Sequence, residues 1–203
     1  LQLRGAADGW SAALPFDEPH DDGAAATAEL LAGGDPAAER LPLPGVSPQW
    51  QSWYHAHRGH WWAEYGVATC AHLAGRGDDA AAAYRASLAA FEYAAAWRGL
   101  GLLAVAADDV DDAVRCYTAA RALDPGDRTL VTELLTLLLD DGRLDAADVV
   151  LDELPDEVAT HGRTRLLAAR CAALRGDAVS ADAQLVGLEV EDLAEGGRDI
   201  EEV

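Results

Sequence analysis

Between residues 94 and 127, apolar positions recur with the period of a helix, break once, and then recur again. The large side chains of this stretch are Trp97, Leu100 and Tyr117, and the small ones that face them are Gly101, Ala113 and Ala120. The pattern ends near Pro125. Because small residues let two helices approach and large ones fill the space between them, the pattern predicts one helix hairpin.

The same pattern returns at intervals of 33 or 34 residues. Tyr84, Tyr117, Leu151 and Leu185 keep this spacing, as do the alanines at 80, 113, 147 and 181 and the glycines at 142 and 176. We therefore predict four hairpins, at about 60–91, 94–127, 128–154 and 163–187, with the third cut short by Pro155. Residues at equivalent positions should lie in equivalent surroundings.

Counted from Ala94, the residues Trp97, Leu100, Gly101, Tyr117 and Pro125 fall at positions 4, 7, 8, 24 and 32. This arrangement resembles the tetratricopeptide repeat, whose signature has these residue types at these positions. Ala104 departs from it, since the family usually has Tyr there. The resemblance implies an all-α, right-handed α-solenoid of about four helix hairpins, with a non-catalytic protein-binding or scaffolding function.

A narrower resemblance covers residues 142–177 and 188–203. These stretches are similar to the C-terminal repeat region of large bacterial proteins that carry an upstream domain of unknown function, itself similar to carbohydrate-active β-sandwich enzymes. Ala194 and Gly197 depart from the tail of that family, and its Trp-containing segment is absent. The resemblance implies the C-terminal part of a larger protein, and leaves open an accessory role in carbohydrate processing.

Prolines and glycines divide the chain into three parts. Residues 1–48 hold six of the eight prolines and one short helical pattern, at about 24–32, so we predict a connector that packs on the first repeat. Residues 49–187 form the predicted repeats, and residues 188–203 form an acidic C-terminal tail.

The net charge of −21 argues against nucleic acid and anionic membranes as partners, because phosphate-rich surfaces require clustered basic residues. All 15 basic residues are Arg, which indicates GC-rich coding bias, with adaptation to high salt as the alternative. The three cysteines lie far apart within predicted helices, and a cytoplasmic location is the simplest setting for them. The chain has no Met, initiator included, so we expect a piece of a longer protein.

The segment 50–65 concentrates Trp and His residues. On a helix, His57, His60 and Glu64 would share a face, but His55 would point away and the spacing matches no strong zinc motif, so we expect no metal and no cofactor.

The aromatic rings of the same segment have two interpretations. Trp62 and Tyr65 could stack on a sugar ring. The favoured alternative is that Trp53, Trp61 and Trp62 seal the end of the array, where the first repeat has no neighbour.

Repeats of this family bind partners through a groove formed by the first helix of each hairpin. The residues at the corresponding positions are Trp62, Tyr65, Thr69, Arg98, Leu102, Val105, Thr132, Thr136, Leu139 and Arg170. The variant that clamps a C-terminal carboxylate uses Lys and Asn, which this chain lacks, so we do not expect that function. Ser87 and Ser180 have no His or Cys partner at meaningful spacing, and we predict no catalytic residues in this segment.

Overall fold

The computed structural model describes residues 26, 29 and 44–188. This part of the chain contains helices and turns but no strand, which confirms the predicted all-α class. The chain forms two compact units, Leu1–Phe91 (unit 1) and Glu92–Val203 (unit 2). Most of the predicted connector and tail lies outside the described residues. Ala26 and Glu29 are both helical and fall within the short helix predicted over 24–32.

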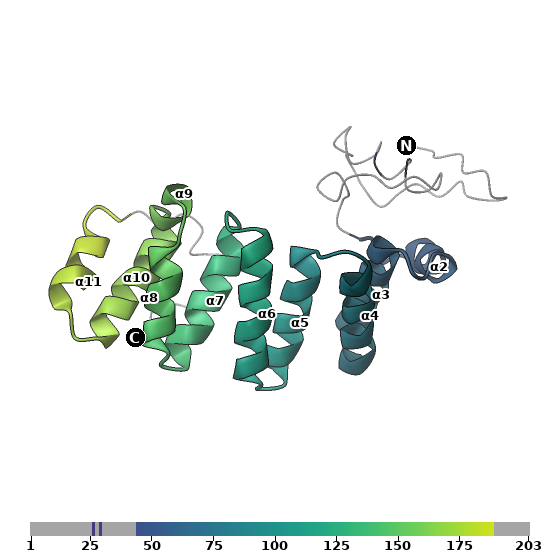
Figure 1. The fold of residues 1–203 in the computed structure, drawn as a ribbon, viewed down its shortest axis with the longest axis horizontal. Helices are drawn as coiled ribbons and strands as arrows, with labels where there is room; N and C mark the ends of the chain where they lie inside the picture. Colours follow the sequence, from purple (N-terminus) through teal and green to yellow (C-terminus); the bar gives the residue numbers. More distant parts are fainter. Residues whose placement is uncertain (1–25, 27–28, 30–43, 189–203) are drawn as a thin grey trace. The chain divides into compact units, whose positions relative to one another are not determined.

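Unit 1 contains the first predicted hairpin and one helix that the sequence pattern did not predict. The hairpin consists of α3 (Trp61–Leu73) and α4 (Gly77–Ala90), and it is preceded by α2 (Pro48–Ala56) (Figure 1). Pro48 suits the first turn of α2, where its missing N–H leaves no bond unmade. Because a Cβ at Gly66 would lie 2.4 Å from the Tyr54 ring, only glycine lets α2 pack this closely on α3.

The core of unit 1 is an aromatic cluster made by Trp50, Trp53 and Tyr54 of α2 around Trp62 of α3. The three ring centroids lie 5.4–5.6 Å from that of Trp62, all in edge-to-face geometry. The Tyr54 hydroxyl donates a 2.9 Å hydrogen bond to the Gly45 carbonyl, so the last described residues before α2 are held against it.

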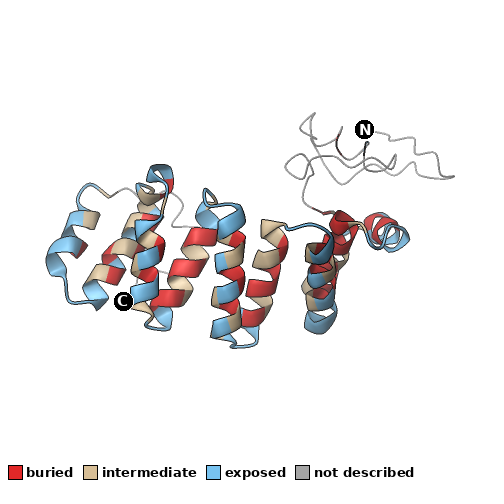
Figure 2. Cartoon of the chain, viewed as in Figure 1, coloured by how far each residue is buried: buried red, intermediate tan, exposed pale blue. Residues whose placement is uncertain are grey.

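Unit 2 contains the other three predicted hairpins, stacked side by side (Figure 1). They are α5 (Ala94–Ala106) with α6 (Val110–Leu123), α7 (Arg128–Asp140) with α8 (Leu144–Asp152), and α10 (Gly162–Leu174) with α11 (Ala178–Leu185). A short helix, α9 (Asp156–Ala159), follows Pro155 and was not predicted. The leucine-rich face of α7 lies at the centre of the core, as the buried band in Figure 2 shows.

The 33- and 34-residue register predicted from the sequence holds at its small positions. Ala80, Ala113 and Ala147 are fully buried, and Ala181 is 8% exposed. The register also appears in the backbone, because the second residue after the first helix of each hairpin has a positive φ: Gly75, Asp108, Gly142 and Gly176, with φ of 70°, 60°, 72° and 79°.

The register weakens at its large positions toward the end of the chain. Tyr84 and Tyr117 are buried, Leu151 is only half-buried and Leu185 is 43% exposed. The prediction that these four side chains have equivalent surroundings is therefore wrong for Leu185. Leucine is smaller than the tyrosines it replaces, and α11 has only eight residues to pack against its neighbour.

Many of the acidic residues have structural roles. Asp109, Asp127 and Asp177 accept hydrogen bonds from backbone amides at the starts of α6, α7 and α11. The doublet Asp140-Asp141, at a helix end where the dipole disfavours carboxylates, is held by ion pairs to Arg170 and Arg143.

Candidate binding surfaces

In unit 2, the predicted groove residues lie on the first helices of successive hairpins, which are α5, α7 and α10. Arg98 of α5 makes a two-pronged ion pair with Glu133 of α7, with N–O distances of 2.8 and 2.6 Å. The hydrogen bond from Arg98 to Glu133, together with the charge of Glu133, raises the pKa of Arg98 above its ordinary value and outweighs burial, which lowers it. Arg170 of α10 lies 2.7 Å from Asp140 of α7. Both arginines therefore join neighbouring helices.

The remaining groove residues in unit 2 are uncharged. Leu102, Thr132 and Thr136 are half-buried, and Val105 is 46% exposed. Leu139 is 3% exposed and belongs to the core. The Thr132 hydroxyl donates a hydrogen bond to the Arg128 carbonyl within α7. The methyl group of Thr132 is therefore the part of this side chain that is available to a partner. The surface is thus a neutral strip flanked by paired charges.

The groove residues predicted in unit 1 are mostly buried. Trp62 is 1% exposed and Tyr65 is 8% exposed, because α2 and α4 cover the rings. This corrects the expectation that their faces line a groove, and it agrees with the packing interpretation of Trp53, Trp61 and Trp62, all of which are buried. Thr69 is half-buried and donates to the Tyr65 carbonyl.

The His and Glu side chains considered for zinc have other roles. The ring of His57 stacks on Trp53 and one ring nitrogen lies 2.8 Å from the Trp53 carbonyl, while His60 accepts the Trp62 amide at the start of α3. Glu64 is bound by Arg58. In the part of the chain that the structure describes, no group of three or more His, Cys, Asp or Glu side chains is arranged to hold a metal ion.

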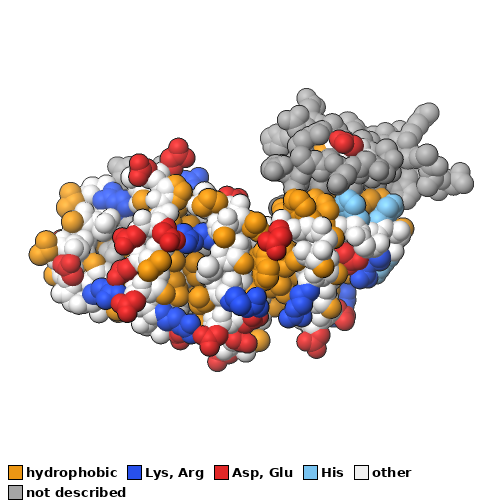
Figure 3. Space-filling view, viewed as in Figure 1, with side chains coloured by type: hydrophobic (Ala, Val, Ile, Leu, Met, Phe, Trp, Pro, Cys, Tyr) orange, Lys and Arg blue, Asp and Glu red, His pale blue; other side chains and the backbone are white. Residues whose placement is uncertain are grey.

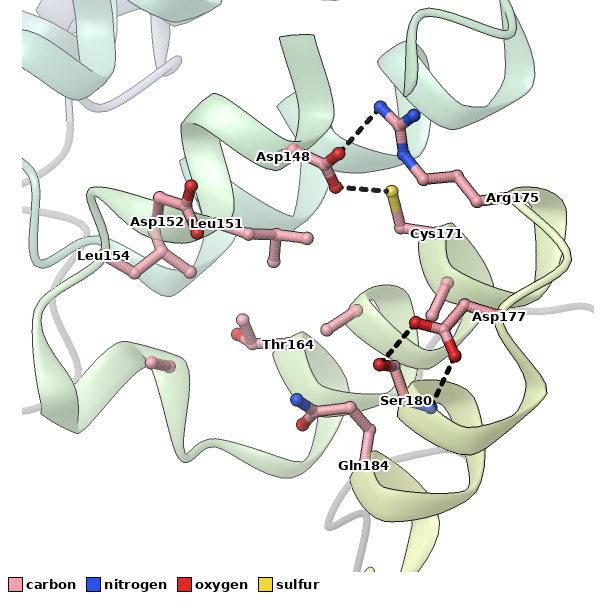
Figure 4. Close-up of a pocket in the computed structure, with 13 residues that line it drawn as sticks. Asp148, Leu151, Asp152, Leu154, Thr164, Cys171, Arg175, Asp177, Ser180 and Gln184 are labelled. Carbon is pink, nitrogen blue, oxygen red and sulfur yellow. Dashed lines mark hydrogen bonds and ion pairs between the residues drawn. The ribbon is translucent and has the colours of Figure 1, made fainter. Parts of the chain in front are cut away.

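A second candidate surface is a pocket of about 450 Å³ in unit 2, which sequence reasoning missed (Figure 4). Its floor is one face of α10, with Thr164, Ala168 and Ala172. One wall comes from α8 and the turn after it, and the opposite wall comes from α11. The walls include Asp148, Leu151, Asp152, Leu154, Ser180 and Gln184.

The polar groups along one edge of this pocket bond to one another. Asp148 accepts a hydrogen bond from the Cys171 thiol at 3.3 Å and makes an ion pair with Arg175 at 2.7 Å (Figure 4). Burial first, and then the bond to Asp148, raise the pKa of the Cys171 thiol, so it stays protonated and unreactive at neutral pH. Asp177 accepts hydrogen bonds from the amide and hydroxyl of Ser180.

Thr164 differs from the other polar groups of the pocket. Its side chain is 1% exposed, and its hydroxyl has no hydrogen-bond partner among the described residues. The repeat register contained a signal for this position, because Thr164 lies 34 residues after the buried Leu130. A polar residue at a position that is apolar in the preceding repeat is a sequence signal for a site.

Over the face shown in Figure 3, the arginines of unit 2 lie beside carboxylates rather than in a basic patch. None of the helices in the described ranges has the length and apolarity that crossing a bilayer needs.

The fold and these surfaces define an all-helical repeat protein. Two tetratricopeptide repeat family models match the chain, one over residues 74–127 and one over residues 104–171, so this region contains tetratricopeptide repeats. The comparison with curated proteins gives no match.

Among solved structures, PcrH from Pseudomonas aeruginosa is similar, with 22% identity and a TM-score of 0.41 over 72% of this chain and 96% of PcrH. PilF of Pseudomonas aeruginosa has 15% identity and a TM-score of 0.36 over 69% of this chain and 82% of its own.

Proposed function

We propose that this chain is a non-catalytic protein-binding or scaffolding module built from tetratricopeptide repeats. The observation that carries the proposal is the succession of helix hairpins in register, which two family models of this repeat match over residues 74–171. Stacked hairpins of this kind expose a continuous row of first helices, and such rows are the binding surfaces of repeat proteins. The partner is a protein or another domain of the same polypeptide.

The chemistry of the groove in unit 2 supports a partner with uncharged side chains. Arg98 and Arg170 each pair with a carboxylate of α7, so binding an anionic peptide there would first require breaking an ion pair. Leu102, Val105, Thr132 and Thr136 instead offer methyl groups. Such a surface suits a segment with small aliphatic side chains.

The narrower resemblance of residues 142–177 extends the proposal. These residues resemble the repeats of large bacterial proteins, and we propose that this chain acts as a module of such a protein. The carbohydrate-processing alternative relied on Trp62 and Tyr65, whose buried rings cannot stack on a sugar. That alternative has therefore lost its main support.

A photocrosslinking experiment tests the binding proposal. A photoreactive phenylalanine analogue at Thr136 should capture a protein in the native cells, and the captured protein is then purified and titrated. Replacing Thr132 and Thr136 by Arg should weaken its binding by about tenfold, or about 1.4 kcal/mol, because two guanidinium groups would have to be desolvated. The matched control is Thr118→Arg, at an exposed position on α6. Equal affinity of both variants would contradict binding in the groove, and the absence of any captured protein would favour a structural spacer.

A further inference from the structure

The pocket on α10 exists because three large side chains are missing from one repeat. Its floor residues Thr164, Ala168 and Ala172 lie 34 positions after Leu130, Leu134 and Leu138. Those three leucines are at most 1% exposed and fill the same space in the preceding hairpin. Replacing leucine by alanine without repacking leaves a cavity, which costs stability. The side chains of Leu151 and Leu154 line this cavity and do not fill it.

Two polar side chains occupy positions of this pocket that are apolar one repeat earlier. Thr164 replaces Leu130, and Gln184 replaces Val150, which is 7% exposed. A buried hydroxyl without a partner is costly, whereas an apolar side chain of the same shape is not. Polar groups at core positions are typical of functional sites rather than of cores optimised for stability. Thr164 and Gln184 together offer a hydroxyl and an amide, which can both donate and accept hydrogen bonds.

The rim of the pocket is acidic. It carries the carboxylates of Asp148, Asp152 and Asp177 against the single guanidinium of Arg175. Asp148 already pairs with Arg175, and Asp152 is exposed with no ion pair among the described residues. The excess of negative charge around an apolar floor favours a ligand that is apolar at its centre and positive at its edges.

From this geometry we infer a peptide-anchoring site. The pocket takes one large aliphatic side chain, such as leucine, from a partner segment whose flanking residues are basic. In this arrangement the aliphatic side chain lies on Ala168 and Ala172 against Leu151 and Leu154, while Thr164 and Gln184 supply hydrogen bonds to the segment. Figure 4 shows Leu151, Leu154, Thr164 and Gln184 around the pocket. The inference rests on the proposed protein-binding function and gives that function a second contact, because Thr132 and Thr136 do not line the pocket.

The direct test uses the tripeptide acetyl-Arg-Leu-Arg-amide as the probe, titrated into the whole chain and followed by methyl NMR. The probe should shift the methyl resonances of Ala168, Ala172 and Thr164. Acetyl-Arg-Ala-Arg-amide should bind at least about tenfold more weakly because it leaves the pocket unfilled, and acetyl-Glu-Leu-Glu-amide should bind more weakly because the rim repels it. If none of the three peptides shifts these methyl groups, water alone fills the pocket and the inference is wrong.

Two variants separate anchoring from mere packing. Ala168→Leu restores the residue type found at Leu134, so it should abolish binding of the leucine peptide while leaving Tm equal or higher. Thr164→Val keeps the shape and removes the hydroxyl, so it should weaken peptide binding severalfold without lowering Tm. Unchanged peptide binding in both variants would place the peptide elsewhere. The variant with Thr132→Arg and Thr136→Arg should still bind the peptide, so failure at the pocket and failure at the groove give different results.

Discussion

At the scale of single residues, Glu64 is a buried charge in the described part of unit 1. Its carboxylate is 4% exposed and accepts hydrogen bonds from Arg58 at 2.7 Å and from the Gly59 amide at 2.8 Å. Burial by itself would raise the pKa of Glu64, but the bonds from Arg58 and Gly59 outweigh burial and hold the pKa below its ordinary value of 4.5. The ionised form of Glu64 therefore stabilises the folded state.

This shift predicts a specific pH dependence. Because the folded-state pKa of Glu64 is lowered, its contribution is present above the unfolded pKa and is lost as the pH falls through the folded value. Glu64→Gln should lower the free energy of unfolding at neutral pH by about 1–3 kcal/mol. The difference between the variant and the unaltered chain should shrink below the ordinary pKa of the carboxyl group. Urea unfolding, followed by Trp fluorescence at several pH values, measures it.

The control for this experiment is Glu157→Gln, because Glu157 is exposed on α9 and has no comparable bonds among the described residues. Its effect should be small at every pH. A Glu64→Gln variant whose deficit stays constant down to acid pH would contradict the role of the ionised carboxylate.

The sequence predicted which small residues are buried, but it did not predict which charged side chains pair. The small residues at 80, 113, 147 and 181 were predicted to be buried and are. Glu64 was considered as a metal ligand, whereas its partner is Arg58, six residues away across a turn. Ion pairing depends on the path of the backbone through that turn, and a helical periodicity does not specify it.

At the scale of elements, each hairpin has the same turn between its helices. In three hairpins the residue with positive φ is Gly75, Gly142 or Gly176, and in the second it is Asp108, with φ of 60°. An L-residue in this conformation brings its Cβ close to the backbone, and glycine avoids that strain.

We therefore expect Asp108→Gly to raise the free energy of unfolding by about 0.5–1 kcal/mol, since relief of strain exceeds the extra chain entropy of glycine. The matched control is Asp108→Ala, which removes the same charge but keeps the Cβ. It should be less stable than the glycine variant by about 1 kcal/mol. Thermal or urea unfolding of the two variants gives the comparison, and equal stabilities would show that the turn is not strained.

The sequence did not predict the two helices α2 and α9. A proline marks the start of each, with Pro48 in the first turn of α2 and Pro155 directly before α9. α2 begins at Pro48, the last residue of the predicted connector, and residues that precede a proline avoid helical geometry. The same proline is well suited to the first turn of a helix. Packing of Tyr54 against Gly66 holds α2 on α3. Because this contact joins two separate helices, no pattern within the sequence of α2 predicts it.

At the scale of the whole molecule, five arginines of unit 2 connect successive hairpins. Arg98 pairs with Glu133, Arg121 with Glu153, Arg143 with Asp111, Arg170 with Asp140 and Arg175 with Asp145, at separations of 35, 32, 32, 30 and 30 residues. These separations are close to one repeat. The repeat fold could be predicted from the sequence because its period is fixed in the chain. The neutral character of the groove could not be predicted from the sequence, because it depends on which carboxylates pair with Arg98 and Arg170.

Two electrostatic effects of opposite sign then act on the stability of the whole chain. Salt weakens the ion pairs between hairpins, but exposed pairs are each worth at most about 1 kcal/mol. Salt also screens the repulsion that comes with a net charge of −21, which opposes the compact state throughout the molecule. Since the carboxylates outnumber the basic groups, 36 against 15, the repulsion should dominate.

Raising NaCl from about 0.05 M to about 0.5 M should therefore increase the Tm of the chain, measured by calorimetry or circular dichroism. The matched variant replaces Arg98 and Glu133 by Gln, which removes the most enclosed of the pairs between first helices and leaves the net charge at −21. This variant should start from a lower Tm and rise at least as steeply with salt, because it has lost an attraction that salt would weaken. If instead the Tm of the unaltered chain falls with salt while that of the variant does not, the ion pairs between hairpins outweigh the repulsion of the whole molecule.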